Sequence, residues 1–201
     1  MKFVTAVVLF AVQTLASDVA DVCPGTVPLR RVPSTGEGTW WLVAGTEMSS
    51  GSCGLNNNQE PCECVSFKFS STLIPPYIPE YNASVYGYDT SDSNSARQDA
   101  TLSLVDKTQP WAIFNFIDKS SNSATVVSAL DTDDHENYII FYLCGVTTAD
   151  SSPIVFIVSK DKAGLSTNKW AEVDAVLVKN NITISSLKTF DTSSCLDSNL
   201  V

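Results

Sequence analysis

Few residues of this chain have side chains that could do chemistry. The only histidine, His135, lies in the polar stretch 131–137, where aspartates can satisfy nearby backbone groups and so favour a tight turn. A histidine in such a turn is expected to face solvent, so we assign it no role as a haem ligand or general base. No serine or cysteine nucleophile stands at a recognisable spacing from a base. The sequence therefore predicts that the protein is not an enzyme and has no catalytic residues.

The six cysteines are the other reactive side chains. Cys62 and Cys64, separated by a single residue, could suggest a metal site. A structural zinc site needs four ligands, however, and the chain has one histidine and no accompanying Cys-x-x-Cys pair. We therefore expect no metal. An even number of cysteines in a secreted chain predicts three disulfides, and the residues alone leave their pairing open.

The N-terminal residues 1–16 have the composition of a signal peptide. Lys2 precedes the apolar run 3–12, which is shorter than the roughly 20 residues that span a bilayer, and small residues follow at Ala16 and Ser17. The alternative is a buried N-terminal helix. We expect cleavage, which leaves residues 17–201 as a single secreted, extracellular domain. The formal net charge of −10 argues against nucleic acid and anionic membranes as partners.

Short runs rich in β-branched and aromatic residues alternate with turn-forming residues along most of the chain. This pattern predicts an all-β sandwich or an up-and-down barrel. The expected strands are 39–46, 64–71, 83–88, 100–106, 111–117, 124–130, 138–146 and 153–159.

The pattern then changes to a helical period over 166–179, where Trp170, Val173 and Leu177 share a face. A last strand is expected at 182–187. A single helix after eight strands suits a barrel better than a sandwich, because it can cover the outer wall. The Gly-, Ser- and Asn-rich gap 47–61 predicts a long loop that Cys53 and Cys62 could pin.

Three short motifs occur in an order that resembles the lipocalin family. They are Gly38-Thr39-Trp40 at the first strand, Thr132-Asp133-Asp134 before the strand ending at Cys144, and Lys160 after the eighth strand. The sequence departs from the lipocalin pattern twice, with Asp134 in place of a tyrosine and Lys160 in place of an arginine. The resemblance implies an eight-stranded antiparallel up-and-down β-barrel with one C-terminal α-helix packed outside. It also implies that Trp40 seals the base and that Lys160 packs over it through a cation–π contact.

These motifs resemble those of the lipocalin branch that contains apolipoprotein D, insect bilin-binding protein and crustacyanin. In that branch an early cysteine pairs with the cysteine that ends the strand after the second motif. A cysteine of the second strand pairs with a cysteine in the C-terminal tail. Carried over, the resemblance implies the disulfides Cys23–Cys144 and Cys64–Cys195, which leaves Cys53 and Cys62 to each other.

A closed eight-stranded barrel leaves room for one small ligand, and strand alternation selects the residues that line it. A disulfide at Cys144 would turn that residue outward and Ile139, Phe141 and Leu143 inward. For any one of these side chains the alternative is ordinary core packing, and alternation does not decide which way Trp41 and Trp111 face. The predicted ligand-binding set is Leu42, Phe67, Phe69, Tyr86, Tyr88, Leu102, Leu104, Phe114, Phe116, Ile139, Phe141 and Phe156.

These features predict a secreted carrier of a small hydrophobic ligand, with no obligatory cofactor. The resemblance implies a pigment, either a carotenoid such as astaxanthin or the tetrapyrrole biliverdin, and a homodimer would be expected with a carotenoid. The alternatives are a carrier of a fatty acid or retinoid, or a protein-interaction module that uses loop 47–61. Asn82 and Asn181 begin sequons for N-glycosylation, and Asn82 is the better candidate.

Overall fold

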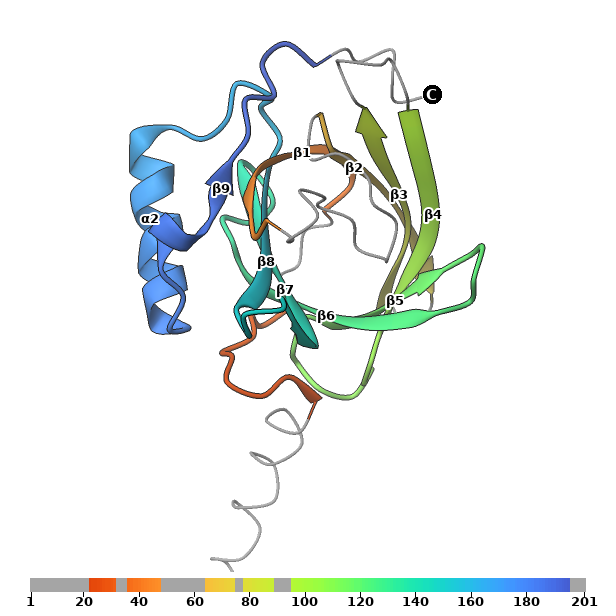
Figure 1. Cartoon of the computed structure of the whole chain (residues 1–201). Helices are drawn as coiled ribbons and strands as arrows, with labels where there is room; N and C mark the ends of the chain where they lie inside the picture. The colour runs from red at the N-terminus through yellow and green to blue at the C-terminus, as the bar shows by residue number, and fades with distance from the viewer. Residues whose placement is uncertain (1–21, 32–35, 48–63, 75–77, 89–94, 196–201) are drawn as a thin grey trace, which may run out of the picture.

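The structure is a computed structural model that describes residues 22–31, 36–47, 64–74, 78–88 and 95–195. Eight antiparallel strands form a closed barrel, because each strand pairs with the next and β1 pairs with both β8 and β2 (Figure 1). The predicted up-and-down barrel is therefore confirmed. The strands are β1 Gly38–Gly45, β2 Ser66–Ile74, β3 Ile78–Tyr88, β4 Ser95–Leu104, β5 Ile113–Asp118, β6 Ala124–Thr132, β7 Tyr138–Thr147 and β8 Pro153–Ser159.

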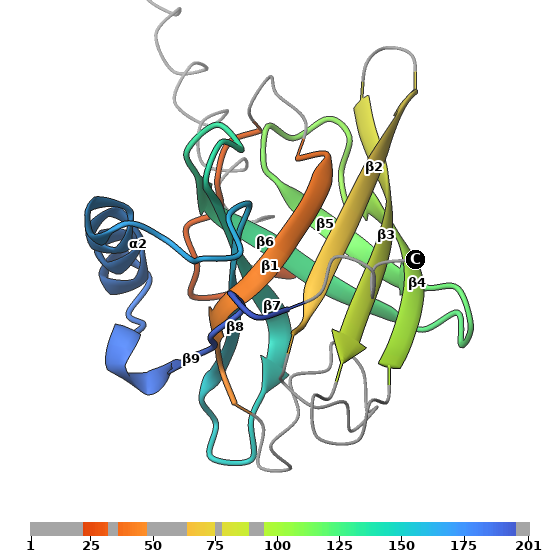
Figure 2. The same ribbon diagram turned by 90° about the horizontal axis from the view of Figure 1, so that it is seen from above.

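One helix, α2 (Thr167–Lys179), lies against the outside of the barrel (Figures 1 and 2). The side chain of Ser166 caps its first turn by accepting a hydrogen bond from the backbone N–H of Lys169, as Ser at an N-cap commonly does. Val173 and Leu177 are fully buried against the wall, which confirms the predicted apolar face. No helix among the described residues is long and apolar enough to cross a membrane.

The last strand predicted at 182–187 is wrong. The chain instead forms a short 3-10 helix, η1 (Ile184–Ser186), followed by the two-residue strand β9 (Lys188–Thr189), which pairs with β1. Ile182, Ile184 and Leu187 all contact the cluster under α2. The spacing of three between Ile184 and Leu187 fits the 3-10 period, and the N–H of Leu187 donates to the carbonyl of Ile184.

The wall between the barrel interior and α2 is apolar on both faces. Along β7 the side chains of Ile139 and Phe141 belong to the interior cluster, whereas Tyr138 and Ile140 pack toward the helix. The side chains of β8 alternate between the same two clusters, and Phe156 belongs to the interior cluster. A strand buried on both faces reads as a continuous apolar run, which explains the dense hydrophobic sequence of β7 and β8.

Two disulfides tie the chain ends to the barrel. Cys23 bonds to Cys144 on β7, and Cys64, just before β2, bonds to Cys195 in the tail. Both pairings implied by the family resemblance are thus confirmed. Cys53 lies outside the described residues, as does Cys62, so their pairing stays a prediction.

The turn between β6 and β7 is held by the residues of the second motif. The Thr132 hydroxyl donates to the carbonyl of Tyr138 and accepts from the N–H of His135. One Asp133 carboxylate oxygen accepts from the N–H groups of Asn137 and Tyr138, and the other lies 3.1 Å from the ammonium of Lys169 on α2. Burial alone would raise the pKa of Asp133, but these hydrogen bonds outweigh it and hold the pKa below its ordinary value.

Replacement of Asp133 by Asn is expected to lower the free energy of unfolding by about 1–3 kcal/mol at pH 7. One of the two carboxylate oxygens that accept hydrogen bonds becomes an amide nitrogen, which cannot accept them. The folded pKa is depressed, so the stabilisation by Asp133 is present above the unfolded pKa of about 3.9 and is lost as pH falls through the folded pKa. The loss of stability in Asp133→Asn should therefore become smaller as the pH falls below the unfolded pKa. Urea denaturation at pH 7 and pH 2.5 measures this.

The exposed neighbour Glu136 provides a matched control, because Glu136→Gln changes the same charge in the same turn. We expect that variant to shift stability by less than about 0.5 kcal/mol. Equal effects of the two substitutions at pH 7 would contradict the role given to Asp133.

Candidate ligand-binding cavity

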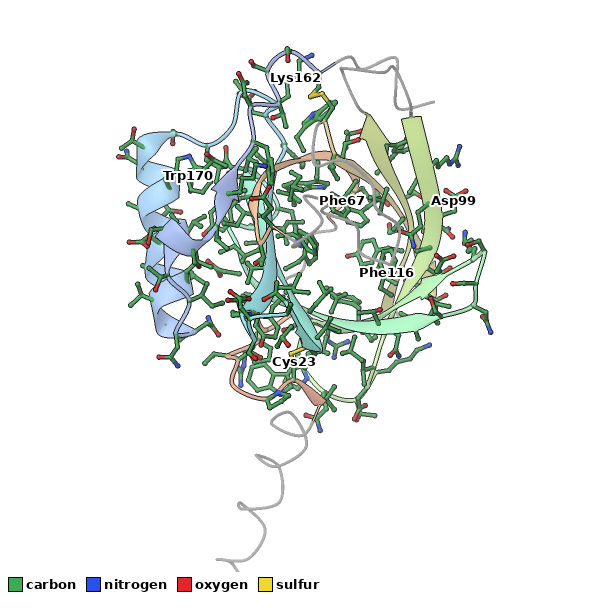
Figure 3. The ribbon with its side chains drawn as sticks, viewed as in Figure 1. Cys23, Phe67, Asp99, Phe116, Lys162 and Trp170 are labelled. Carbon is green, nitrogen blue, oxygen red and sulfur yellow. A yellow bond between two sulfur atoms is a disulfide. The ribbon has the colours of Figure 1, made fainter. Side chains whose placement is uncertain are left out.

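Most of the predicted lining residues point into the barrel. Figure 3 shows Phe67 and Phe116 directed into the space that the strands enclose. Ten of the twelve predicted side chains belong to a single buried cluster inside the barrel. They are Leu42, Phe67, Phe69, Leu102, Leu104, Phe114, Phe116, Ile139, Phe141 and Phe156.

Two predicted lining residues do not join this cluster. Tyr86 points outward, because Ala83 and Val85 on the same strand face inward, and the Arg97 guanidinium lies 5.4 Å from the centre of its ring. The expectation that Tyr86 lies near the cavity mouth is therefore corrected. The side chain of Tyr88 lies outside the described residues.

Trp41 and Trp111, whose orientation the sequence left open, both lie on the outer surface of the barrel. Trp41 packs beside the disulfide of Cys64 and Cys195. Trp111 packs beside Cys23, and the guanidinium of Arg30 lies 5.6 Å from its ring centre. Neither tryptophan therefore lines the interior.

The larger cavity described inside the barrel has a volume of about 60 Å³. It is several times the space that one water needs, and well below the roughly 300–1,000 Å³ of a pocket for a drug-sized ligand. Of the predicted set, Phe69, Leu102, Phe114, Ile139 and Phe141 line it. The described residues that line it are Leu29, Arg31, Gly36, Phe69, Tyr81, Leu102, Ala112, Phe114, Ala129, His135, Ile139 and Phe141.

Phenylalanine side chains occupy much of the remaining interior. A second void of about 20 Å³ lies among Phe67, Phe116, Phe156 and their neighbours. The rings of Phe67 and Phe156 are 6.5 Å apart, a normal distance for packed aromatic pairs. Core packing, the alternative considered for each aromatic residue, thus describes this part of the barrel.

Four aromatic rings form a connected group around the larger cavity, which we call the aromatic box: Phe69, Tyr81, Phe114 and Phe141. The ring of Phe69 is 6.4 Å from Tyr81 and 6.1 Å from Phe141, and Tyr81 is 6.1 Å from Phe114. The Tyr81 pairs are edge-to-face, an arrangement that aromatic quadrupoles favour. Tyr81 was missed because the third strand was predicted to begin at 83, whereas β3 begins at Ile78.

Trp40 lies fully buried at the end of the barrel where β1 begins. Its indole N–H donates to the carbonyl of Gly36 at 2.8 Å, and the Lys160 ammonium lies 5.0 Å from its ring centre. The cation–π contact implied by the family resemblance is therefore present, with lysine in the place of arginine.

His135 lies beside the cavity, which corrects the expectation that it faces solvent. It is half-buried, and a Cβ added to Gly36 would be 3.4 Å from its ring carbon Cδ2. The cause is local, since Asp134 and His135 both have left-handed backbone conformations with φ of 61° and 60°. Residue type alone does not reveal two successive left-handed residues, because such conformations are uncommon outside glycine.

Comparison with known proteins finds similarity in structure only. No protein-family model matches the chain, and no curated protein matches it in sequence. Lobster apocrustacyanin A1 is 19% identical with a TM-score of 0.61 over 82% of each chain. The amine-binding protein of Rhodnius prolixus, solved as its tryptamine complex, is 14% identical with a TM-score of 0.62 over 84% of this chain and 85% of its own.

The cockroach allergen Per a 4 is 16% identical, with a TM-score of 0.56 over 84% of this chain and 98% of its own. At such low identities the likeness is one of fold. This chain therefore has the lipocalin fold, as its three motifs predicted.

Replacement of Lys160 by Met removes the cation above Trp40 and keeps most of the aliphatic stem. We expect the free energy of unfolding to fall by up to about 1 kcal/mol, because exposed cation–π contacts contribute about that much. Lys160→Arg should retain the wild-type value. Urea denaturation followed by tryptophan fluorescence measures both, with Lys107→Met as the control at an exposed lysine. A loss in the arginine variant equal to that in the methionine variant would contradict the contact.

Proposed function

We propose that this protein binds and carries a small, largely apolar molecule inside its barrel. The observation that carries the proposal is the cavity of about 60 Å³, which is lined by the aromatic box and by aliphatic side chains such as Leu102 and Ile139. Concave, mostly apolar sites with a few polar groups are the usual form of small-molecule sites in proteins. Removal of apolar surface from water would supply the affinity, at about 25 cal/mol per Å².

Two further observations support a carrier rather than an enzyme. A neighbour of the same fold, the Rhodnius protein, is an amine-binding protein in complex with tryptamine, a small molecule with an aromatic ring system. Among the described residues that line the cavity are one histidine, one arginine and one tyrosine, and none of those described is a serine or a cysteine.

A pigment is the second candidate, and the family resemblance favours it. A carotenoid such as astaxanthin is much larger than the described cavity, so it would require the aromatic side chains Phe67, Phe116 and Phe156 to move, or a second subunit to share it. The expected homodimer belongs to this candidate alone. Biliverdin, a fatty acid or a retinoid would also exceed the described cavity and would need the same side chains to move.

The proposal includes secretion into an oxidising compartment. The two described disulfides support it, because such bonds persist mainly in extracellular proteins. The expected signal peptide at 1–16 and, apart from Glu47, the expected loop 47–61 lie outside the described residues. Asn82 and Asn181 are both exposed and could accept a glycan. Intact-mass measurement of the secreted product tests cleavage after Ala16 and the use of both sequons.

Titration with the fluorescent probe 1-aminoanthracene tests ligand binding directly. We expect saturable binding of one probe per chain with a blue-shifted emission, because the probe leaves water for the apolar cavity. Ala129, a small lining residue on β6, gives the test variant: Ala129→Leu fills the cavity and should weaken binding at least about tenfold. Ala124→Leu is the matched control, because Ala124 lies on the same strand, outside the cavity and exposed.

Absence of probe binding, or equal binding by Ala129→Leu and wild type, would overturn the proposed site. Extraction of the secreted protein with organic solvent, with astaxanthin and biliverdin added to separate samples, covers the pigments. A shifted visible band identifies a pigment carrier. No extractable molecule and no response to any probe would favour the protein-interaction module instead.

A further inference from the structure

The polar groups of the cavity gather at one end. Arg31, Tyr81 and His135, which we call the polar rim, are the described lining residues whose side chains can form strong hydrogen bonds. Arg31 and Gly36 belong to the segment before β1, and His135 belongs to the turn between β6 and β7. All lie at the end that Trp40 closes, whereas Phe69, Phe114 and Phe141 form an apolar body beyond them. The cavity is therefore amphipathic.

Arg31 carries a positive charge into this rim. It is half-buried, and its guanidinium donates a long hydrogen bond of 3.5 Å to the carbonyl of Lys107. Within the described part of the chain, no carboxylate lies within 4 Å of it. The planar guanidinium can donate two parallel hydrogen bonds to a carboxylate, which makes such pairs stronger and more specific than neutral contacts.

Two carboxylates outside the cavity act on the rim through their charge, Glu37 on Tyr81 and Asp106 on Arg31. The Glu37 carboxylate accepts from both the side-chain hydroxyl and the N–H of Ser71, and these bonds lower its pKa. Asp106 accepts from the hydroxyl and N–H of Thr108. Neither carboxylate lines the cavity. Among the described lining residues Arg31 carries a positive charge and none has a carboxylate, so an anionic group fits beside Arg31 better than a cationic one.

Tyr81 adds a neutral donor. Burial raises its pKa above the ordinary value, so the phenol stays protonated at neutral pH. Its ring is part of the aromatic box, while its hydroxyl lies near the backbone of Gly36. One residue can thus contact both an aromatic ring and a polar head group of the same ligand.

We propose that the cavity selects small aromatic carboxylates, with the ring inside the aromatic box and the carboxylate bound by Arg31 at the polar rim. This inference rests on the proposed function, because it names the ligand class of the same cavity. It also distinguishes this chain from its structural neighbour in complex with tryptamine, whose ligand carries a cationic head on an aromatic ring.

Three ligands with the same indole ring and different head groups test the inference: indole-3-acetate, 3-methylindole and tryptamine. Isothermal titration calorimetry at pH 7.5 should show that indole-3-acetate binds at least about tenfold more tightly than 3-methylindole, and that tryptamine binds most weakly. Arg31→Met should reduce the ratio of the first two affinities to about one. Arg30→Met is the matched control and should keep the wild-type ratio, because Arg30 packs over Trp111 and does not line the cavity.

Equal affinity for the three ligands, preference for tryptamine, or an unchanged ratio in Arg31→Met would overturn this inference. Binding of 1-aminoanthracene in the same preparation would then show that the proposed function stands without it. Failure of all three indoles and of 1-aminoanthracene would overturn both proposals. Circular dichroism of each variant confirms that the fold is retained before its affinities are compared.

Discussion

Closure of the barrel through β1 is the constraint on which the rest of the structure depends. This strand pairs with β8 on one side and with β2 on the other, so the sheet has no free edge in its eight-stranded ring. Closure fixes which side of each strand faces the interior, and so brings residues as distant in sequence as Phe69 and Phe141 within 6.1 Å of each other. The cavity exists because the ring closes around side chains that do not fill it completely.

The elements outside the ring support that closure. Helix α2 covers the outer faces of β7 and β8, β9 pairs with β1, and two disulfides fasten the segments before β1 and after β9 to the wall. The turn between β6 and β7 links the helix to the barrel through Asp133 and Lys169. The same turn places His135 beside the cavity, so the motif that stabilises the fold also shapes the site.

The alternation of side chains along a strand predicted the interior residues correctly wherever a second observation fixed which side of the strand faces inward. In β7 the disulfide at Cys144 decided that Phe141 faces inward. In β3 no such fact was available, and Tyr86 was assigned to the wrong face while Tyr81 was missed beyond the expected strand end. The position of His135 depends on two left-handed backbone conformations. The formation of the 3-10 helix η1 in place of the expected strand depends on packing under α2. Both are tertiary effects that residue types alone do not specify.

The central claim is that the larger cavity of the barrel is the ligand site and that its polar rim orients the ligand. A crystal structure of the protein with indole-3-acetate tests it most directly. The account predicts ligand density among Phe69, Phe114 and Phe141, with the carboxylate within hydrogen-bond distance of Arg31. Density elsewhere on the molecule, or an indole bound with its carboxylate directed away from Arg31, would contradict it.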